Sequence, residues 1–542
     1  MTGRAAPLRL NLRLKRSFLV GLSLATMLSG CDMAPRYNPT KLTMPAEWEG
    51  QSHGVLQSAR PADDAIRPDW WTMLGDPELN RLEEQAIRLN PDLQARAEAF
   101  MQARDVAMEA KSHLYPQVTG GAGGEKYKGS RHRLWRGAGS QGPVYMSSEQ
   151  YSGTATWEPD FWSAIRNKVR MAKQGTQAEA AAYALAKLSL QAELASDYVT
   201  LRGLDAQDAV YRDSIRYYQT AVQVTKMRLA GAIAPGMDVS RAETQLYTTQ
   251  AQETEVRAQR DVMEHAIAVL VNEAPASFHI APVTRLSFAE IQPPVALPST
   301  LLERRPDIAE AERRMAQANR AIGVSRAAFY PHITFNAMTG FMDNGFDLAS
   351  LSNSMYQFGV QALMPLFQGG LRRAELQRNW SQYREKEDLY RSTVLDAFQE
   401  VEDNLTRTSR LKTESQQQSN AVAAALHTQT MTMALYTGGL TNYLDVVVAQ
   451  VAALNARIAL VQVQTRAVDA RVELIRALGG GWSRAELPQS DKIMPFQPLQ
   501  YGNLRHAAPL GGITTQPDPA ASDLTSGGAN MRQPLDTTGA HR

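Results

Sequence analysis

Several residue types and motifs are rare or missing in this chain, and each absence argues against a class of protein. Cysteine occurs once in 542 residues, so no disulfide can form within one chain. Lysine and arginine number 57 and aspartate and glutamate 55, a balance that does not favour a nucleic-acid partner. The sequence has no glycine-rich phosphate loop and no zinc-type histidine pair. We therefore expect no enzyme, no catalytic residues, no cofactor and no metal site.

Glycine and proline are also missing from very long stretches. Residues 371–437 contain neither over 67 positions, and residues 440–478 contain neither over 39. In the first half, residues 163–230 lack proline and hold two glycines, and residues 237–274 lack both. A 67-residue helix is roughly 100 Å long, whereas globular helices have about 8 to 20 residues. These lengths predict a coiled coil or a helical tube.

The chain reads as two copies of one plan. Residues 91–119 match residues 306–334 at an offset of 215, including the Pro-Asp and Tyr-Pro pairs. Later, Gly231 and Asp238 match Gly438 and Asp445 at an offset of 207. Because these weak matches keep the same order, they predict two internal structural repeats. In each repeat, one long helix would lie beside two shorter helices stacked end to end.

Short alternating segments lie between the helices. Apolar and polar residues alternate over residues 151–158, 333–337 and 357–364, as in a membrane barrel, although half-buried strands of a soluble sheet would alternate similarly. Glycine, serine and asparagine in residues 120–150 and 341–355 predict exposed loops. Four strands cannot close a barrel that needs about eight or more. Two copies of the chain would supply eight strands and three copies twelve.

The N-terminus predicts export and lipidation. Five arginines and lysines precede an apolar run at residues 17–27, which is too short to span a bilayer permanently. The run ends at Leu28-Ser29-Gly30-Cys31, which resembles a bacterial lipoprotein box with Cys31 as the lipid-bearing residue. An ordinary signal peptide with an incidental cysteine is the alternative. Asp32 resembles an inner-membrane retention signal of some enteric bacteria.

These signals predict a domain organisation, which follows in chain order. We expect a signal peptide at 1–30, a lipid-anchored segment at 31–75, a first repeat at 76–290, a second repeat at 299–482 and a disordered tail at 489–542. The β-hairpins are expected at about 115–160 and 330–367. The long helical hairpins are expected to turn at about 231–238 and 438–445.

Local motifs resemble those of a known family. The string at 301–312, which includes Arg304-Arg305-Pro306-Asp307, the Trp70-Trp71 pair and the Gly-Asp-Pro-Glu-Leu segment at 75–79 are similar to the outer-membrane efflux family of TolC and OprM type. The lipidated form resembles the NodT branch, which serves resistance-nodulation-division pumps. The resemblance covers roughly residues 28–482. It implies a homotrimer with a twelve-stranded β-barrel in the bacterial outer membrane, a twelve-helix periplasmic tunnel, a periplasmic adaptor and an inner-membrane pump.

The same resemblance implies sites at the helical hairpin tips. The tips Gly231-Ala232-Ile233 and Gly438-Gly439-Leu440 would contact the adaptor, and the first glycine of each is expected to take the left-handed backbone of the turn.

The resemblance also implies that Leu444, Asp445 and Tyr443 form the closed periplasmic aperture. Relatives often carry a second acid where this chain has Val448. We therefore expect the constriction to depend more on the packing of Leu444 and Tyr443 than on the charge of Asp445. Asp238 is expected to be an ordinary acidic residue in the first turn of its helix.

Three functions remain compatible with the sequence. The first is an efflux duct for drugs, solvents or other toxic small molecules. The second is a duct for heavy-metal export or type I protein secretion, and the third is a coiled-coil scaffold that forms no channel. The sequence does not identify the substrate.

Overall fold

A computed structural model describes most of the chain. The described residues are 32–38, 69–130, 145–289, 301–343 and 350–488. The predicted signal peptide, Cys31 and the tail at 489–542 lie outside these residues.

The described chain consists of long helices and one sheet. After the 3-10 helix η1 (Trp70–Leu74), the first half contains α3 (Pro77–Leu89), α4 (Pro91–Ser112), β1 (Gln117–Lys128), β2 (Tyr145–Trp157), α5 (Ala164–Ala230) and α6 (Gly236–Leu270). The second half contains α7 (Leu301–Arg304), α8 (Pro306–Ala327), β3 (His332–Asp343), η3 (Leu351–Asn353), β4 (Ser354–Leu363), α9 (Leu371–Thr437), α10 (Tyr443–Ala477) and η4 (Arg484–Glu486). The predicted 67-residue helix is confirmed in α9, and α5 has the same length.

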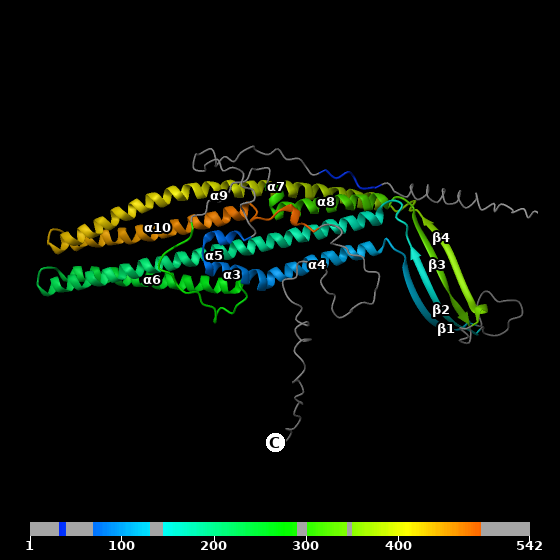
Figure 1. The fold of residues 1–542 in the computed structure, drawn as a ribbon, viewed down its shortest axis with the longest axis horizontal. Helices are drawn as coiled ribbons and strands as arrows, with labels where there is room; N and C mark the ends of the chain where they lie inside the picture. Colours follow the sequence, from blue (N-terminus) through cyan, green and yellow to red (C-terminus); the bar gives the residue numbers. More distant parts are fainter. Residues whose placement is uncertain (1–31, 39–68, 131–144, 290–300, 344–349, 489–542) are drawn as a thin grey trace, which may run out of the picture.

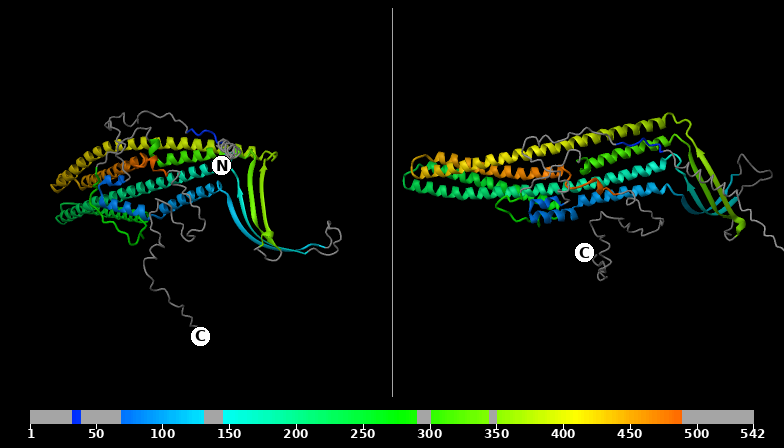
Figure 2. Two further views of the ribbon diagram at one scale, coloured as in Figure 1. Left: turned by 45° about the vertical axis from the view of Figure 1, so that its right-hand side comes forward. Right: turned by 45° about the horizontal axis from the view of Figure 1, so that its top comes forward.

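The helices lie side by side along one axis, with the sheet at one end and two hairpin tips at the other (Figure 1). Each half places a long helix beside two shorter ones: α5 packs on α4 and α6, and α9 packs on α8 and α10. Figure 2 shows the same arrangement from two further sides, with the strands bent away from the helical axis. The predicted fold class, long helices joined to a four-stranded sheet in two repeats, is confirmed.

Local signals fix where the shorter helices begin. The Asp76 side chain accepts hydrogen bonds from the backbone N–H groups of Glu78 and Leu79, at the start of α3. Asn90 caps α4 by accepting from the Leu93 N–H. Proline stands at the first position of α3, α4 and α8, where its missing N–H has no helical partner to lose.

The sheet is antiparallel throughout, in the order β1-β2-β3-β4. Trp157 pairs with Phe335, which pairs with Val360, and Thr156 pairs with Asn336 on the opposite face. One face is therefore mainly apolar and the other mainly polar, as predicted. Within the described chain, β1 and β4 are edge strands whose outer backbone groups face no further strand.

Two of the expected loops are shorter than predicted. Residues 120–128 and 145–150 belong to β1 and β2, and β3 continues to Asp343. Glycine and serine are weak strand formers, but these residues form a continuous ladder that pairs their backbone groups. Composition alone therefore misplaced the boundary between strand and loop.

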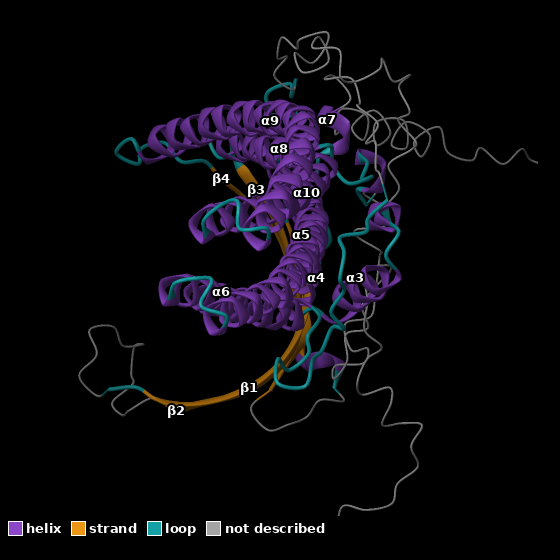
Figure 3. Cartoon of the chain, turned by 90° about the vertical axis from the view of Figure 1, so that its left-hand side faces the viewer, coloured by secondary structure: helices purple, strands orange, loops and turns teal. Residues whose placement is uncertain are grey.

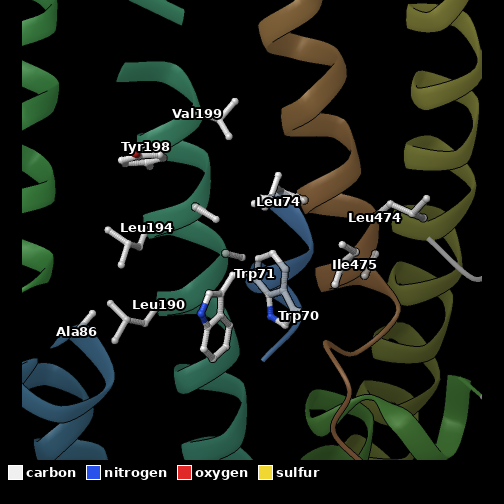
Figure 4. Packing of buried hydrophobic residues seen from close by; sticks show 14 of the residues in the cluster. Trp70, Trp71, Leu74, Ala86, Leu190, Leu194, Tyr198, Val199, Leu474 and Ile475 are labelled. Atoms are coloured by element: carbon white, nitrogen blue, oxygen red, sulfur yellow. The ribbon is translucent and has the colours of Figure 1, made fainter. Parts of the chain in front are cut away.

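The core lies where the helices meet near the middle of the bundle. Viewed along the bundle, the long helices form an open arc, and α3 lies on its convex side (Figure 3). Trp70 and Leu74 pack between Leu194 of α5 and Ile475 of α10 (Figure 4). Both Trp70 and Leu194 are fully buried. Burying one such side chain stabilises the fold by about 1.5–3 kcal/mol, so this cluster holds the two halves together.

A buried ionic network fixes the segment that follows α6. The Asp205 carboxylate accepts hydrogen bonds from Arg202, Arg260 and the backbone N–H of Val283. The side chain of Asp205 is 1% exposed. A buried charge without partners is costly, so the three donors together keep this segment against α5 and α6.

Among the described residues, α10 is the one helix whose length and hydropathy suit a membrane span. It packs along α9 and α5 within the bundle.

Helices α5 and α10 approach each other closely at Gly203. A Cβ atom at this position would overlap the side chain of Thr465. We expect Gly203→Ala to destabilise the protein by about 1–3 kcal/mol, because overpacked cores shift their backbone. Thermal melting of the detergent-purified protein, followed by circular dichroism, measures this. Adding Thr465→Ala should restore most of the loss.

Gly175→Ala is the matched control for this prediction. A Cβ atom there would meet the end of the flexible Gln317 side chain. We expect Gly175→Ala to be close to neutral, because alanine also favours the helix. An equal loss of stability in both variants would contradict the steric explanation.

Candidate functional site

Each helical hairpin turns through the same backbone motif. In the first tip, the N–H of Ile233 donates to the carbonyl of Arg228, and the N–H of Ala232 donates to Leu229. In the second, Leu440 donates to Leu435 and Gly439 to Tyr436. These are the two hydrogen bonds of a Schellman motif, which pairs otherwise open helix-end carbonyls.

The left-handed residue of each tip differs from the prediction. Ala232 has a φ of 54° and Gly439 a φ of 76°. Gly231 and Gly438 have negative φ values. The expectation that the first glycine takes the left-handed backbone is therefore wrong, because the motif requires it one residue later. Of the two tips, only the first has a residue other than glycine, Ala232, in this conformation.

Both tips present an apolar side chain to solvent. Ile233 is 68% exposed and Leu440 is 77% exposed. Each directly follows the left-handed residue, and the rest of its tip is also exposed, except Ala234. The two repeats thus place equivalent apolar side chains at the same end of the bundle.

The three predicted aperture residues have different surroundings. Tyr443 is fully buried, Leu444 is 46% exposed, and Asp445 is exposed. Asp445 accepts a hydrogen bond from the Thr441 hydroxyl, and its backbone N–H donates to the Asn442 side chain, which caps α10. The Tyr443 side chain therefore supports the first turn of α10 from inside the bundle. Leu444 remains accessible.

Leu444 belongs to an exposed apolar strip. Val448 follows it by one helical turn and is 62% exposed. Leu444 and Val447 also line a shallow groove with Met237, at the start of α6. The other residues that line this groove, on α6, are polar and include Arg241 and Gln245.

Contacts near the tips join the two hairpins, and sequence reasoning missed them. The Tyr436 hydroxyl of α9 donates to the Asp238 carboxylate of α6 at 3.1 Å. Arg228 of α5 donates to the carbonyl of Thr437, and its guanidinium lies 4.7 Å from the centre of the Tyr436 ring. Asp238 is therefore a buried acceptor between hairpins and not only a first-turn acid. The matching acid, Asp445, has no equivalent tyrosine, because Leu229 takes the place of Tyr436 in the first repeat.

A tyrosine cluster surrounds this contact. Tyr436 and Tyr443 meet edge to face at 5.0 Å, and the Tyr218 hydroxyl donates to the carbonyl of Gln450. Burial raises the pKa of Tyr436, and its hydrogen bond to Asp238 raises it further. Burial also raises the pKa of Tyr443. These phenols stay neutral and can donate hydrogen bonds over the physiological pH range.

Further polar contacts link α5 to α10, one at the level of the core and one between the core and the tips. Arg457 pairs with Asp213 at 2.8 Å, and Ser196 bonds to Asp469. Asp213 is about half exposed, so its pair with Arg457 contributes little to stability. This pair therefore adds little to the apolar packing that holds α5 and α10 together, which includes the close approach at Gly203.

The segment directly after Cys31 lies along α8, near the sheet. Its Asp32 carboxylate accepts hydrogen bonds from Arg170, Arg320 and Asn167. Tyr37 donates to Glu312 further along α8. Asp32 is thus part of the folded structure. Cys31 itself lies outside the described residues.

The described residues contain no group of three or more His, Cys, Asp or Glu side chains that could hold a metal ion. The polar groups at the tips form hydrogen bonds and ion pairs between helices. Their arrangement suits a reversible contact between two rigid hairpins.

Comparisons with known proteins agree with this arrangement. A family model described as outer membrane efflux protein matches residues 82–273 and 297–480. The chain is 28% identical to the pyoverdine export outer membrane protein OpmQ of Pseudomonas aeruginosa, over 85% of this chain and 96% of OpmQ. It is 27% identical to the toluene efflux pump outer membrane protein TtgC of Pseudomonas putida, over 84% of this chain and 94% of TtgC.

Solved structures show the same fold. The outer-membrane channel OprN superposes with a TM-score of 0.77 at 24% identity, covering 83% of this chain and all of the OprN chain. The outer membrane protein VceC of Vibrio cholerae superposes with a TM-score of 0.72 at 26% identity, covering 77% of this chain and 99% of VceC.

The two tips provide a matched pair of backbone tests. We expect Ala232→Gly to stabilise the protein and Gly439→Ala to destabilise it, each by about 1 kcal/mol, because the left-handed region penalises a Cβ atom. Melting temperatures of the two purified variants measure both effects. Shifts of the same sign would show that φ does not control the stability of the tips.

Proposed function

This chain belongs to the outer membrane efflux protein family, and we propose that it forms a gated duct through which small molecules leave the cell. The matched residues include most of both repeats, and membership places the chain in the bacterial outer membrane. OpmQ and TtgC are named for the export of pyoverdine and toluene. Because two relatives of this chain are named for different exported molecules, we infer a duct whose substrates are selected by another component of the efflux system. We further propose that the chain performs no chemistry of its own.

The proposed duct is a homotrimer. The described sheet has four strands with two open edges, β1 and β4. A lipid bilayer cannot satisfy unpaired backbone N–H and C=O groups, so each edge needs a strand from another copy. Three copies give twelve strands, as in the family. The mainly apolar face of the sheet would then contact lipid and the polar face would line the pore.

The helices would continue the pore as a tunnel. Three copies of the arc seen in Figure 3 would close into a ring. Helix α3, with the core cluster beneath it, would lie on the outer side of this ring. The hairpin tips would form the narrow end of the tunnel, remote from the membrane. Residues 32–38 would run along the outside towards the membrane, with Cys31 carrying the lipid anchor.

We propose that the bond between Tyr436 and Asp238 keeps the narrow end closed. This hydrogen bond supports the proposal because it joins the second hairpin to the first close to the tip. Opening would separate the hairpins and expose both groups to water. The core near Trp70 would stay packed and act as the fixed end of the movement.

The aperture itself would be apolar. Leu444 and Val448 lie on the accessible side of α10, so three copies would place rings of apolar side chains in the neck. A narrow apolar constriction blocks ions by excluding water. Asp445 would add one ring of three carboxylates at the same level.

The partners of the tips would be a periplasmic adaptor and an inner-membrane pump. The exposed Ile233 and Leu440 give each protomer two apolar contact points for the adaptor. The pump would supply the energy for transport. The alternative ducts, for metal export or protein secretion, would use the same gate, whereas the scaffold alternative is set aside by the family membership.

Conductance in planar bilayers tests the gate. We expect Tyr436→Phe to raise the open probability about tenfold or more, because Asp238 loses its donor in three copies of the contact. Tyr247→Phe removes a hydroxyl from an exposed tyrosine of α6 and is the matched control. If Tyr436→Phe opens no more often than Tyr247→Phe, the bond does not hold the gate closed.

The aperture has a separate test. We expect Leu444→Ala to raise the conductance of the closed state several-fold, because the shorter alanine side chains leave a wider opening in the apolar ring. Asp445→Asn changes charge with little change in size and should leave this conductance nearly unchanged. The reverse pattern would show that the charge of Asp445 forms the barrier.

A further inference from the structure

The ends of the four helices that join the sheet carry a concentration of positive charge. Within the ten residues of α4, α5, α8 and α9 nearest the sheet, there are eleven lysines and arginines but three aspartates and glutamates. Over the whole chain the two kinds of charge nearly cancel, at 57 and 55. The surplus of eight positive charges therefore belongs to one end of the helical bundle, and the rest of the chain is acidic on balance.

Five of these side chains come from three neighbouring helices, and we call them the cationic cluster. They are Lys111 of α4, Arg170 and Lys173 of α5, and Arg320 and Arg326 of α8. Figure 1 shows α4, α5 and α8 running together into the sheet, with residues 32–38 in dark blue near α8. The cluster therefore lies where the helical bundle meets the strands.

Residues 32–38 contact three of the five cations. The Asp32 carboxylate lies 2.5 Å from Arg170 and 3.0 Å from Arg320. Arg326 donates to the carbonyl of Met33 at 3.3 Å. Asp32 thus bridges two of the cations, Arg170 and Arg320, whose side chains are 43% and 24% exposed.

The cations are close enough to repel one another. Burial lowers the pKa of Lys173, and the charges of Lys111 and Arg170 lower it further. Asp32 pairs with two of the five side chains, Arg170 and Arg320. An added anion between them would relieve this repulsion.

Aromatic residues mark the level of the membrane interface beside the cluster. Trp162 stacks on Tyr330 with ring centres 4.8 Å apart, between the sheet and the helices. Phe367, four residues after β4 ends, is 90% exposed. Tryptophan and tyrosine favour the headgroup level of a bilayer. Lys111 and Arg326 each stand six residues before the strand that follows them, so they lie just beyond this level on the helical side.

We propose that the cationic cluster binds the headgroups of anionic phospholipids in the leaflet that faces the helical tunnel. Basic side chains close to a membrane attract anionic lipid, and arginine forms paired hydrogen bonds with phosphate oxygens. Arg170 and Arg320 would contact the lipid phosphate with the donors that Asp32 leaves open. The inference rests on the proposed function, because the sheet must lie in the membrane for the cluster to meet headgroups.

Tryptophan quenching measures this preference in the whole protein. The full chain is reconstituted into vesicles that contain brominated phosphatidylglycerol or brominated phosphatidylcholine, and Trp157 and Trp162 report the lipid beside them. At low salt we expect phosphatidylglycerol to bind about threefold or more tightly than phosphatidylcholine. The preference should disappear near 1 M salt, where the screening length is about 3 Å.

A matched pair of double variants locates the site. Lys111→Gln with Lys173→Gln should lower the lipid preference by about half, because two of the five charges are removed while Arg170 and Arg320 keep their phosphate contacts. Arg407→Gln with Lys412→Gln removes the same charge from exposed positions of α9 far from the sheet and should leave the preference unchanged. No preference in the unmodified protein, or equal loss in both double variants, would overturn the proposal.

Conductance recorded in the same lipids separates this proposal from the proposed function. A conducting protein without lipid preference would contradict the headgroup site alone. A protein that neither inserts nor conducts would contradict the duct as well.

Discussion

Unpaired backbone groups at the edges of the sheet are the constraint on which the rest of this structure depends. Strands β1 and β4 each present a row of N–H and C=O groups that has no partner within the described chain. In a membrane such an edge is intolerable, because hydrocarbon offers no hydrogen bonds. Closing it with copies of the same chain also closes the helices into a tunnel, since α4, α5, α8 and α9 connect directly to the strands. The sheet therefore determines the assembly, and the assembly turns an open arc of helices into a duct.

The two repeats differ in their contacts at the proposed gate. Asp238 and Asp445 occupy matching positions, yet Asp238 is buried under Tyr436 and Asp445 is exposed beside Leu444. In the proposed gate, one repeat would supply the acceptor that holds the hairpins together, and the other would supply the residues that face the neck. A symmetric pair of hairpins could close a tube equally well. Because the repeats differ, the second hairpin bonds to the first through Tyr436 and Asp238, and the proposed opening would break this bond.

Patterns that extend over long stretches of the sequence predicted most of the fold. The stretches without glycine and proline predicted helices such as α9, and alternation at residues such as Trp157 and Phe335 predicted which strand faces are apolar. The extent of β1 was underestimated, because glycine-rich residues 120–124 look like a loop when the pairing strand is unknown.

The candidate site was harder to predict than the fold. The family resemblance predicted roles for the tips, Leu444 and Asp445, which stay predictions. It did not predict the contact between Tyr436 and Asp238, which are 198 residues apart. The left-handed turn residue was misplaced by one position, because glycine at Gly231 suggested a conformation that Ala232 adopts. Such details depend on which side chains meet across elements, and composition and spacing do not determine that.

Hydrogen exchange at the edge strands in a lipid bilayer tests whether copies of the chain close the sheet. We expect the backbone amides of β1 and β4 to exchange as slowly as those of β2 and β3, in a particle with the mass of three chains. Rapid exchange confined to β1 and β4, in a particle with the mass of one chain, would contradict it.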